Sequence, residues 1–171
     1  EYHRAAPGGS GGVKAIGNYA PGMMPSRKAK DAGYAEIIYL DAEEHKYVEE
    51  VGAANFFCVK DNTLYTPELT GTILPGITRD SIIQLARQMG HEVVETKVEA
   101  EFAMNADEAF CCGTAAVISP IGQITLGGKT ATYADGSTPG EVTQKLYDAL
   151  TNIQSEVGED IFGWLHPVPG M

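Results

Sequence analysis

Two strands and the turn between them are written in NFFCVKDNTLYTP, residues 55–67. Residues 55–59 combine aromatic and β-branched side chains, a composition that favours a buried strand. Asp61-Asn62 is a turn signal, because both residue types tolerate the left-handed backbone region. A second strand returns through residues 64–66, and Pro67 ends it because proline has no N–H to donate. The stretch predicts an antiparallel strand pair.

The chain on either side of this pair predicts further antiparallel strands. Ile37-Ile38-Tyr39-Leu40 indicates a buried strand, and the polar residues 43–46 lead into Tyr47-Val48, which predicts a hairpin. Strand signals return at Val93-Val94 and again from Phe110 to Ile118 around a Gly113-Thr114 turn. Strands and helices do not alternate regularly, so we expect mixed α and β structure without a βαβα rhythm.

Two helices stand out by their apolar spacing. The first follows Pro75-Gly76, carries apolar residues at 82, 85, 86 and 89, and stops at Gly90; Thr78 is its expected N-cap. The second begins near Pro139 and has an apolar face over residues 142–153. A third segment, after Tyr19, contains Pro21 and Pro25, which should delay or kink helix entry there.

Composition narrows the function classes. The chain has 171 residues, enough for one domain, and a formal net charge of -11 without a basic cluster, so nucleic acid and anionic membranes are poor partners. No run approaches the ~20 apolar residues of a membrane span, and we expect a soluble protein. Three cysteines without metal-ligand or disulfide spacing favour a reduced, intracellular protein without a metal site. The opening Glu1-Tyr2 lacks any targeting pattern and suggests a piece of a longer protein.

Lys14 follows a glycine-rich stretch, APGGSGGV, residues 6–13. One interpretation of this stretch is a flexible linker followed by a solvated lysine. The other is a loop whose small residues let the backbone approach a flat ligand, with Lys14 as a covalent carrier. A nucleotide-binding P-loop is excluded, because Val13 and Ala15 stand where that motif needs Gly and Ser or Thr.

Three more positions could bind ligands. One of Glu49 and Glu50 must face inward in an alternating strand, where it needs a cationic group or a protonated ring nitrogen; the alternative is an exposed strand end. Thr78 lies at a helix start, which attracts anions such as phosphate but is also an ordinary capped helix. The Gly113-Thr114 turn offers amides for an oxyanion, or simply packs tightly.

Taken in order, these segments resemble the branched-chain aminotransferases, which are fold-type IV pyridoxal-phosphate enzymes. The resemblance covers nearly the whole chain and is carried by GGVKAIGNY (11–19), EVGAANFF (50–57), LPGITR (74–79), ADEAF (106–110) and GTAA (113–116). It implies an α+β fold like the large domain of D-amino acid aminotransferase, with antiparallel strands forming a pseudo-barrel and helices packed around it.

The resemblance also implies roles for individual residues. Lys14 would be the catalytic residue, joined to pyridoxal 5'-phosphate as a Schiff base and acting as general base. Glu50 would pair with the ring nitrogen. The other implied contacts are Tyr19 to the ring oxygen and the substrate, Ile77, Thr78 and Thr114 to the phosphate, and Thr114 and Ala115 to the substrate carboxylate.

The implied reaction moves an amino group between leucine, isoleucine or valine and 2-oxoglutarate. Alternatives are a D-amino acid transaminase, an aminodeoxychorismate lyase or a catalytically silent scaffold. Residues 1–171 would form the C-terminal cofactor-binding domain; a small N-terminal domain, absent here, would supply a phosphate-binding arginine and pocket aromatics. The full-length enzyme would be a homodimer, in the cytoplasm, a mitochondrion or a plastid.

Overall fold

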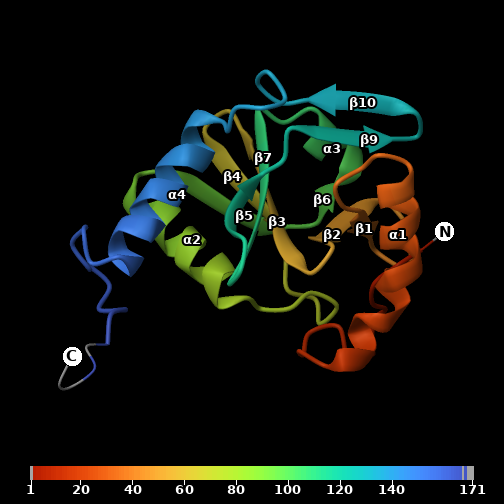
Figure 1. Cartoon of the computed structure of the whole chain (residues 1–171), viewed down its shortest axis with the longest axis horizontal. Helices are drawn as coiled ribbons and strands as arrows, with labels where there is room; N and C mark the ends of the chain where they lie inside the picture. Colours follow the sequence, from red (N-terminus) through yellow and green to blue (C-terminus); the bar gives the residue numbers. More distant parts are fainter. Residues whose placement is uncertain (1, 167, 169–171) are drawn as a thin grey trace.

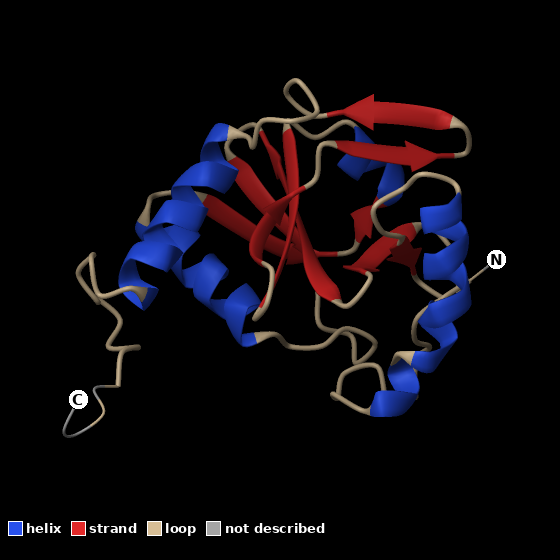
Figure 2. Ribbon diagram, in the orientation of Figure 1, coloured by secondary structure: helices blue, strands red, loops and turns tan. Residues whose placement is uncertain are grey.

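The computed structural model describes residues 2–166 and 168, which contain ten strands, four α-helices and two short 3-10 helices (Figures 1 and 2). The helical elements are η1 (Ile16–Asn18), η2 (Ala20–Gly22), α1 (Met23–Asp31), α2 (Ile77–Gln88), α3 (Ala100–Met104) and α4 (Glu141–Gln154). The strands are β1 (Ile38–Leu40), β2 (Tyr47–Val51), β3 (Ala54–Lys60), β4 (Thr63–Pro67), β5 (Glu92–Thr96), β6 (Val98–Glu99), β7 (Glu108–Gly113), β8 (Val117–Pro120), β9 (Gln123–Leu126) and β10 (Lys129–Thr132).

Strand β3 is the hub of an eight-stranded sheet. It pairs antiparallel with β2, β4 and β7; β1 and β6 pair with β2, and β8 pairs with β7. Strand β6 also lies beside β4, so β2, β3, β4 and β6 enclose a common interior. Helices α2 and α4 lie together on one side of the sheet, and α1 lies at the opposite end of the molecule (Figure 1). The β9–β10 hairpin forms a separate two-stranded sheet.

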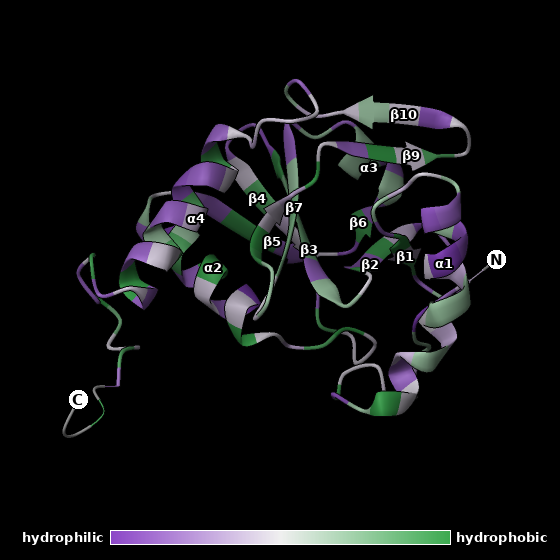
Figure 3. Ribbon diagram, in the orientation of Figure 1, coloured by the Kyte–Doolittle hydropathy of each residue, from purple (hydrophilic) through white to green (hydrophobic). Residues whose placement is uncertain are grey.

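Alternation along β3 divides the core in two. Phe57 and Val59 face α2 and α4, where the Phe57 ring stacks on Phe110 with centroids 5.0 Å apart. Phe56 and Cys58 face a second cluster between β2, β6 and α3. Because both faces of β3 are covered, its middle residues are apolar without interruption, whereas the outer side of α4 is hydrophilic (Figure 3). Each buried phenylalanine contributes about 1.5–3 kcal/mol of transfer free energy.

Helix boundaries follow local chemistry, with one correction. Gly76, not Thr78, is the N-cap of α2: its backbone is extended, and Thr78 lies inside the first turn. Helix entry after Tyr19 is delayed, as the prolines predict: the 3-10 turn η2, which contains Pro21, precedes α1, and Pro25 falls in the first turn of α1. Helix α4 starts at Glu141 rather than at Pro139, and the Glu108 carboxylate accepts its first amides.

The α+β expectation is confirmed, with two differences. β4 and β5 are parallel, because α2 connects them as a crossover and returns the chain to the same edge. β6, α3 and the β9–β10 hairpin were not predicted: β6 and α3 are short, and the alternation in Gln123–Leu126 before the Gly127-Gly128 turn was overlooked. None of the helices in the described part of the chain has the length and apolar character needed to cross a membrane.

Candidate functional site

The glycine-rich loop before Lys14 is fixed, not a free linker. Asn18 is buried and donates its side-chain amide to the carbonyls of Ser10 and Val13, both at 2.7 Å, while Ser10 Oγ donates to its Oδ1 at 2.6 Å. A Cβ on Gly11 would overlap the Thr72 carbonyl, so the loop packs its backbone directly against residues 71–72. This contact explains why the loop needs glycine.

Glu49 and Glu50 are both buried, at 5% and 2% exposure, so neither is solvated at a strand end. Glu50 Oε1 accepts from Asn55 Nδ2 at 3.1 Å and from the Leu74 amide at 3.3 Å. Glu49 accepts from the Thr72 hydroxyl. Burial raises the pKa of Glu50 to about 7 against the opposing charge of Arg4, and burial also raises the pKa of Glu49.

Arg4 is the cation that the buried carboxylates require. Its Nε lies 2.5 Å from Glu50 Oε2, an ion-pair contact without good hydrogen-bond alignment, and the side chain is 7% exposed. Its terminal nitrogen donates to the Gly11 carbonyl at 3.3 Å and to the Thr72 carbonyl. One side chain therefore links β2, the loop before Lys14 and the segment leading to α2.

The start of α2 lies beside Glu50 because Asn55 holds it there. Asn55 donates to the Leu74 carbonyl at 2.9 Å, and its Oδ1 comes so close to Gly76 that a Cβ there would overlap it. Gly76 makes no side-chain cap, so the first amides of α2, at Ile77 and Thr78, are available to an anion. Ile77 is 83% exposed and Thr78 half-buried.

The β7–β8 turn reaches the same end of the sheet. Asn55 pairs with Cys112 across β3 and β7, and the turn that carries Thr114 and Ala115 begins two residues later. Both residues are exposed. Within the described residues, the hydroxyls of Thr78 and Thr114 make no protein hydrogen bond, so both remain available to a ligand.

Tyr19 lines a cavity of about 230 Å³ together with Arg4, Asn18, Gly52 and Ala53. Lys14 follows the fixed loop directly and is exposed. The loop before Lys14 is linked to Glu50 through Arg4, and the segment before α2 is linked to it through the Leu74 amide. The polar groups on these segments are an amine, a buried carboxylate, two hydroxyls and the free amides of a helix start. This set suits a ligand that carries an aldehyde, a protonated ring nitrogen and a phosphate.

Sequence reasoning missed three residues: Arg4, Asn18 and Asn55. The need for a cation near Glu50 was foreseen, but nothing marks Arg4 as that cation. Asn55 was treated only as part of a strand, and Asn18 only as part of a motif. Among the described residues, no cluster of three or more His, Cys, Asp or Glu could hold a metal ion.

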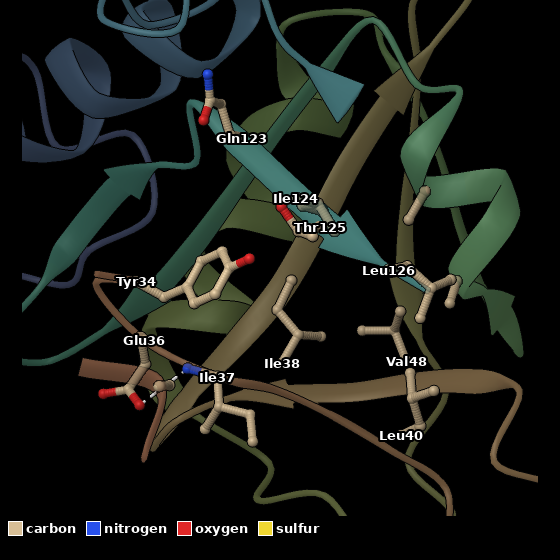
Figure 4. Close-up of a pocket in the computed structure, with 13 residues that line it drawn as sticks. Tyr34, Glu36, Ile37, Ile38, Leu40, Val48, Gln123, Ile124, Thr125 and Leu126 are labelled. Carbon is tan, nitrogen blue, oxygen red and sulfur yellow. Dashed lines mark hydrogen bonds between the residues drawn. The ribbon is translucent and has the colours of Figure 1, made fainter. Parts of the chain in front are cut away.

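A second cavity, about 220 Å³, is lined mainly by apolar residues and lies apart from the predicted site residues. Figure 4 shows Ile38 and Leu40 of β1 and Val48 of β2 facing Ile124 and Leu126 of β9, with Tyr34 at one side. None of the predicted cofactor or substrate contacts lines it.

The family model for class IV amino-transferases matches residues 4–124. The chain is 49% identical over 164 residues to chloroplastic branched-chain-amino-acid aminotransferase 3 of Arabidopsis thaliana (96% of this chain, 40% of the relative). It is 47% identical over 175 residues to a probable branched-chain-amino-acid aminotransferase of Staphylococcus epidermidis (99% and 49%). The chain therefore spans less than half the length of these relatives.

Solved structures give the same grouping. The branched-chain amino acid aminotransferase of Escherichia coli superposes with a TM-score of 0.87 at 38% identity, covering 98% of this chain and 53% of that one. The branched-chain amino acid aminotransferase of Thermobaculum terrenum, in its PLP-bound holo form, superposes with a TM-score of 0.80 at 32% identity, covering 92% and 50%.

Proposed function

Because the chain belongs to the class IV aminotransferases, we propose that it is the cofactor-binding half of a branched-chain amino acid aminotransferase. The enzyme would move the amino group between leucine, isoleucine or valine and 2-oxoglutarate, with pyridoxal 5'-phosphate as cofactor. The names of the similar proteins support the substrate class. The observation that carries the proposal is the buried Glu50 carboxylate, because the loop of Lys14 and the start of α2 both converge on it.

When bound, pyridoxal phosphate supplies an electrophilic aldehyde and an electron-accepting ring. Glu50 would hold the proton on the ring nitrogen, because a buried carboxylate stabilises a neighbouring cation. Ile77 and Thr78 amides and the Thr78 and Thr114 hydroxyls would bind the phosphate at the free start of α2. These contacts fix both ends of the ring relative to the protein.

Lys14 would do the chemistry. Its Nζ would hold the cofactor covalently through the aldehyde, and the freed amine would take the proton from the substrate α-carbon and hold it. The Tyr19 hydroxyl would bond the ring oxygen and the substrate, and the Thr114 and Ala115 amides would hold the substrate carboxylate. The exposed position of Lys14 suits a residue that must reach a ligand.

Exposed apolar side chains near the site support two further parts of the proposal: an upstream domain that completes the site, and assembly into a homodimer. The segments that carry the site residues also carry exposed apolar side chains: Val13 at 58%, Ile16 at 90%, Met23 at 75% and Ile77 at 83% exposure. Apolar side chains around a polar site are typical of a surface that another domain or subunit covers. We propose that a small upstream domain and a second subunit cover these side chains. The three free cysteines support a reducing compartment.

The test compares the 171-residue chain alone with the chain joined to an upstream domain. Without that domain's arginine, the phosphate loses a charge-assisted bond of roughly 1.5–3 kcal/mol, so cofactor affinity should be lower by about one to two decades. The chain alone should transaminate leucine hardly at all, and the joined protein should do so with 2-oxoglutarate as acceptor. Near-normal leucine turnover by the chain alone would contradict the need for a second domain. D-alanine as the preferred donor would contradict the substrate.

A further inference from the structure

Arg4 lies where three segments of the site meet. It contacts Glu50 on β2, the Gly11 carbonyl in the loop before Lys14, and the Thr72 carbonyl before α2. The side chain is almost fully buried, and its partners come from parts of the chain up to 68 residues away. A planar guanidinium with five donors can join three partners in this way, whereas an ammonium group cannot keep the same geometry.

The groups around Glu50 make the charge of Arg4 decisive. Asn55 and the Leu74 amide donate to Oε1, and the thiol of Cys112 lies near enough for the Glu50 charge to affect it. Burial raises the pKa of Glu50 to about 7, and the positive charge of Arg4 opposes that effect. Glu49, the next residue along β2, adds a second carboxylate that also raises the pKa of Glu50. Without Arg4, two buried carboxylates would share no cation.

We propose that Arg4 is a positioning residue that favours the ionised form of Glu50 and fixes the Lys14 loop relative to it. The idea rests on the proposed function, since an ionised Glu50 is what a protonated ring nitrogen needs. In this view Arg4 touches neither cofactor nor substrate. It acts on the ring through the Glu50 carboxylate and on the amine through the carbonyl of Gly11.

A purely structural role for Arg4 makes a different prediction, and Arg79 provides the matched control. Arg79 is also buried, at 3% exposure, and pairs with Glu95 at 2.9 Å while donating to the Pro67 carbonyl at 2.9 Å. Replacing either arginine removes a buried cation that binds a carboxylate and a carbonyl. Of the two arginines, Arg4 pairs with Glu50 and Arg79 pairs with Glu95 instead.

The experiment follows the titration of Glu50 in the cofactor-free chain by carboxyl ¹³C NMR, with Glu50→Gln identifying the resonance. An opposite charge at this distance lowers a carboxyl pKa by about 1–3 units, so Arg4→Gln should raise the Glu50 midpoint by about that amount. Arg79→Gln should lower stability and leave the midpoint unchanged. An unchanged midpoint in Arg4→Gln, or equal shifts in both variants, would overturn the proposal.

Arg4→Lys keeps the charge and loses the planar fork, so it separates the two parts of the role. We expect a Glu50 midpoint close to that of the unsubstituted chain, and it serves as the test if Arg4→Gln does not fold. If the Glu50 midpoint in Arg4→Lys were raised as far as we expect for Arg4→Gln, the charge argument would be contradicted.

In the enzyme joined to its upstream domain, the acidic limb of the kcat profile should move to higher pH in Arg4→Gln and return in Arg4→Lys. The titration needs no cofactor. It therefore stands even if cofactor never attaches to Lys14, an outcome that would contradict the proposed function alone.

Discussion

The middle and the start of β3 are stabilised by opposite means. Its middle is covered by apolar side chains, with Phe57 stacked on Phe110 and both rings fully buried. Its start, at Asn55, is held by polar bonds to Glu50 and Leu74. Removing apolar surface from water stabilises the core. Burying carboxylates destabilises the other region, the site edge, by which we mean the start of β3 at Asn55 with Glu50 and the start of α2 beside it.

Exposure reverses between the two regions as well. The core buries its apolar residues, while the site edge leaves Ile16 and Ile77 almost fully exposed. An edge that buries charge and exposes hydrocarbon is arranged for something other than its own stability. Mutations in the core should therefore affect folding, and mutations at the edge should affect chemistry.

The substitution Lys14→Ala should separate an effect on chemistry from an effect on stability most clearly. The side chain is exposed, so the free energy of unfolding should change by less than about 0.5 kcal/mol. Attachment of cofactor, followed by borohydride reduction and peptide mapping, should be abolished, and so should turnover in the joined enzyme. Lys60→Ala is the control: Lys60 is paired with Asp107 on the surface, and its replacement should leave cofactor attachment and turnover unchanged. Reduced cofactor on Lys28, Lys30 or Lys60 would show that the attachment site was chosen wrongly.

Phe57→Ala should have the converse effect. Truncating a fully buried phenylalanine leaves a cavity and costs about 3–5 kcal/mol, measured by urea unfolding. Phe102→Ala is the control, because that ring is 37% exposed and should cost clearly less. Equal losses at the two positions would remove the distinction between the buried core and the rest of the molecule.

Glu50→Gln should reduce turnover more than cofactor binding. An amide cannot hold a protonated ring nitrogen as a carboxylate does, while the phosphate contacts at α2 are untouched. We expect kcat to fall by about two decades, equivalent to ~2.7 kcal/mol. Glu49→Gln changes an equally buried carboxylate that faces Thr72 instead, and its effect should be mild. The reverse ranking in matched assays would show that Glu49 is the ring partner.

The core could be predicted from sequence more fully than the edge. Alternation and helical spacing depend on neighbouring residues, so β3, β4, α2 and α4 were foreseen close to their true bounds. The link from Arg4 to Thr72 spans 68 residues, and no local pattern encodes it. The predicted N-cap failed for a related reason: Asn55, distant in sequence, sets the path of the chain at Gly76.

Stability should depend on pH in opposite directions for the two kinds of carboxylate. The folded pKa of Glu50 is raised to about 7, so the folded chain binds more protons than the unfolded one between about pH 4.5 and 7. Stability contributed by Glu50 is therefore lost as pH rises through that window. At Asp41, burial raises the pKa of the carboxyl group, but hydrogen bonds from four backbone amides outweigh that effect and lower the pKa to about 2. Its contribution is lost as pH falls from about 4 to 2.

The cofactor-free chain should therefore be most stable near pH 4.5, and Glu50→Gln should flatten the limb between about pH 4.5 and 7. Urea midpoints measured across about pH 2–8 test this. A maximum at about pH 7 or above in the unsubstituted chain would contradict a raised Glu50 pKa.

The smallest expected effect is at the start of α4, where a polar contact supports the core. Glu108 of β7 accepts from the amides of Val142 and Thr143, at 3.0 and 2.8 Å, and from the Thr143 hydroxyl at 2.7 Å. The helix has Gly140 as N-cap and no side-chain cap of its own, so Glu108 performs that task from another strand. Glu108→Ala should cost about 1 kcal/mol and lower Tm by roughly 2–4 °C. Glu159→Ala, at an exposed position, should stay within about 0.5 kcal/mol. Cofactor attachment to Lys14 should be the same in both variants, because α4 packs on the core and not on the site edge. A loss of attachment in Glu108→Ala would show that the two ends of the sheet are coupled.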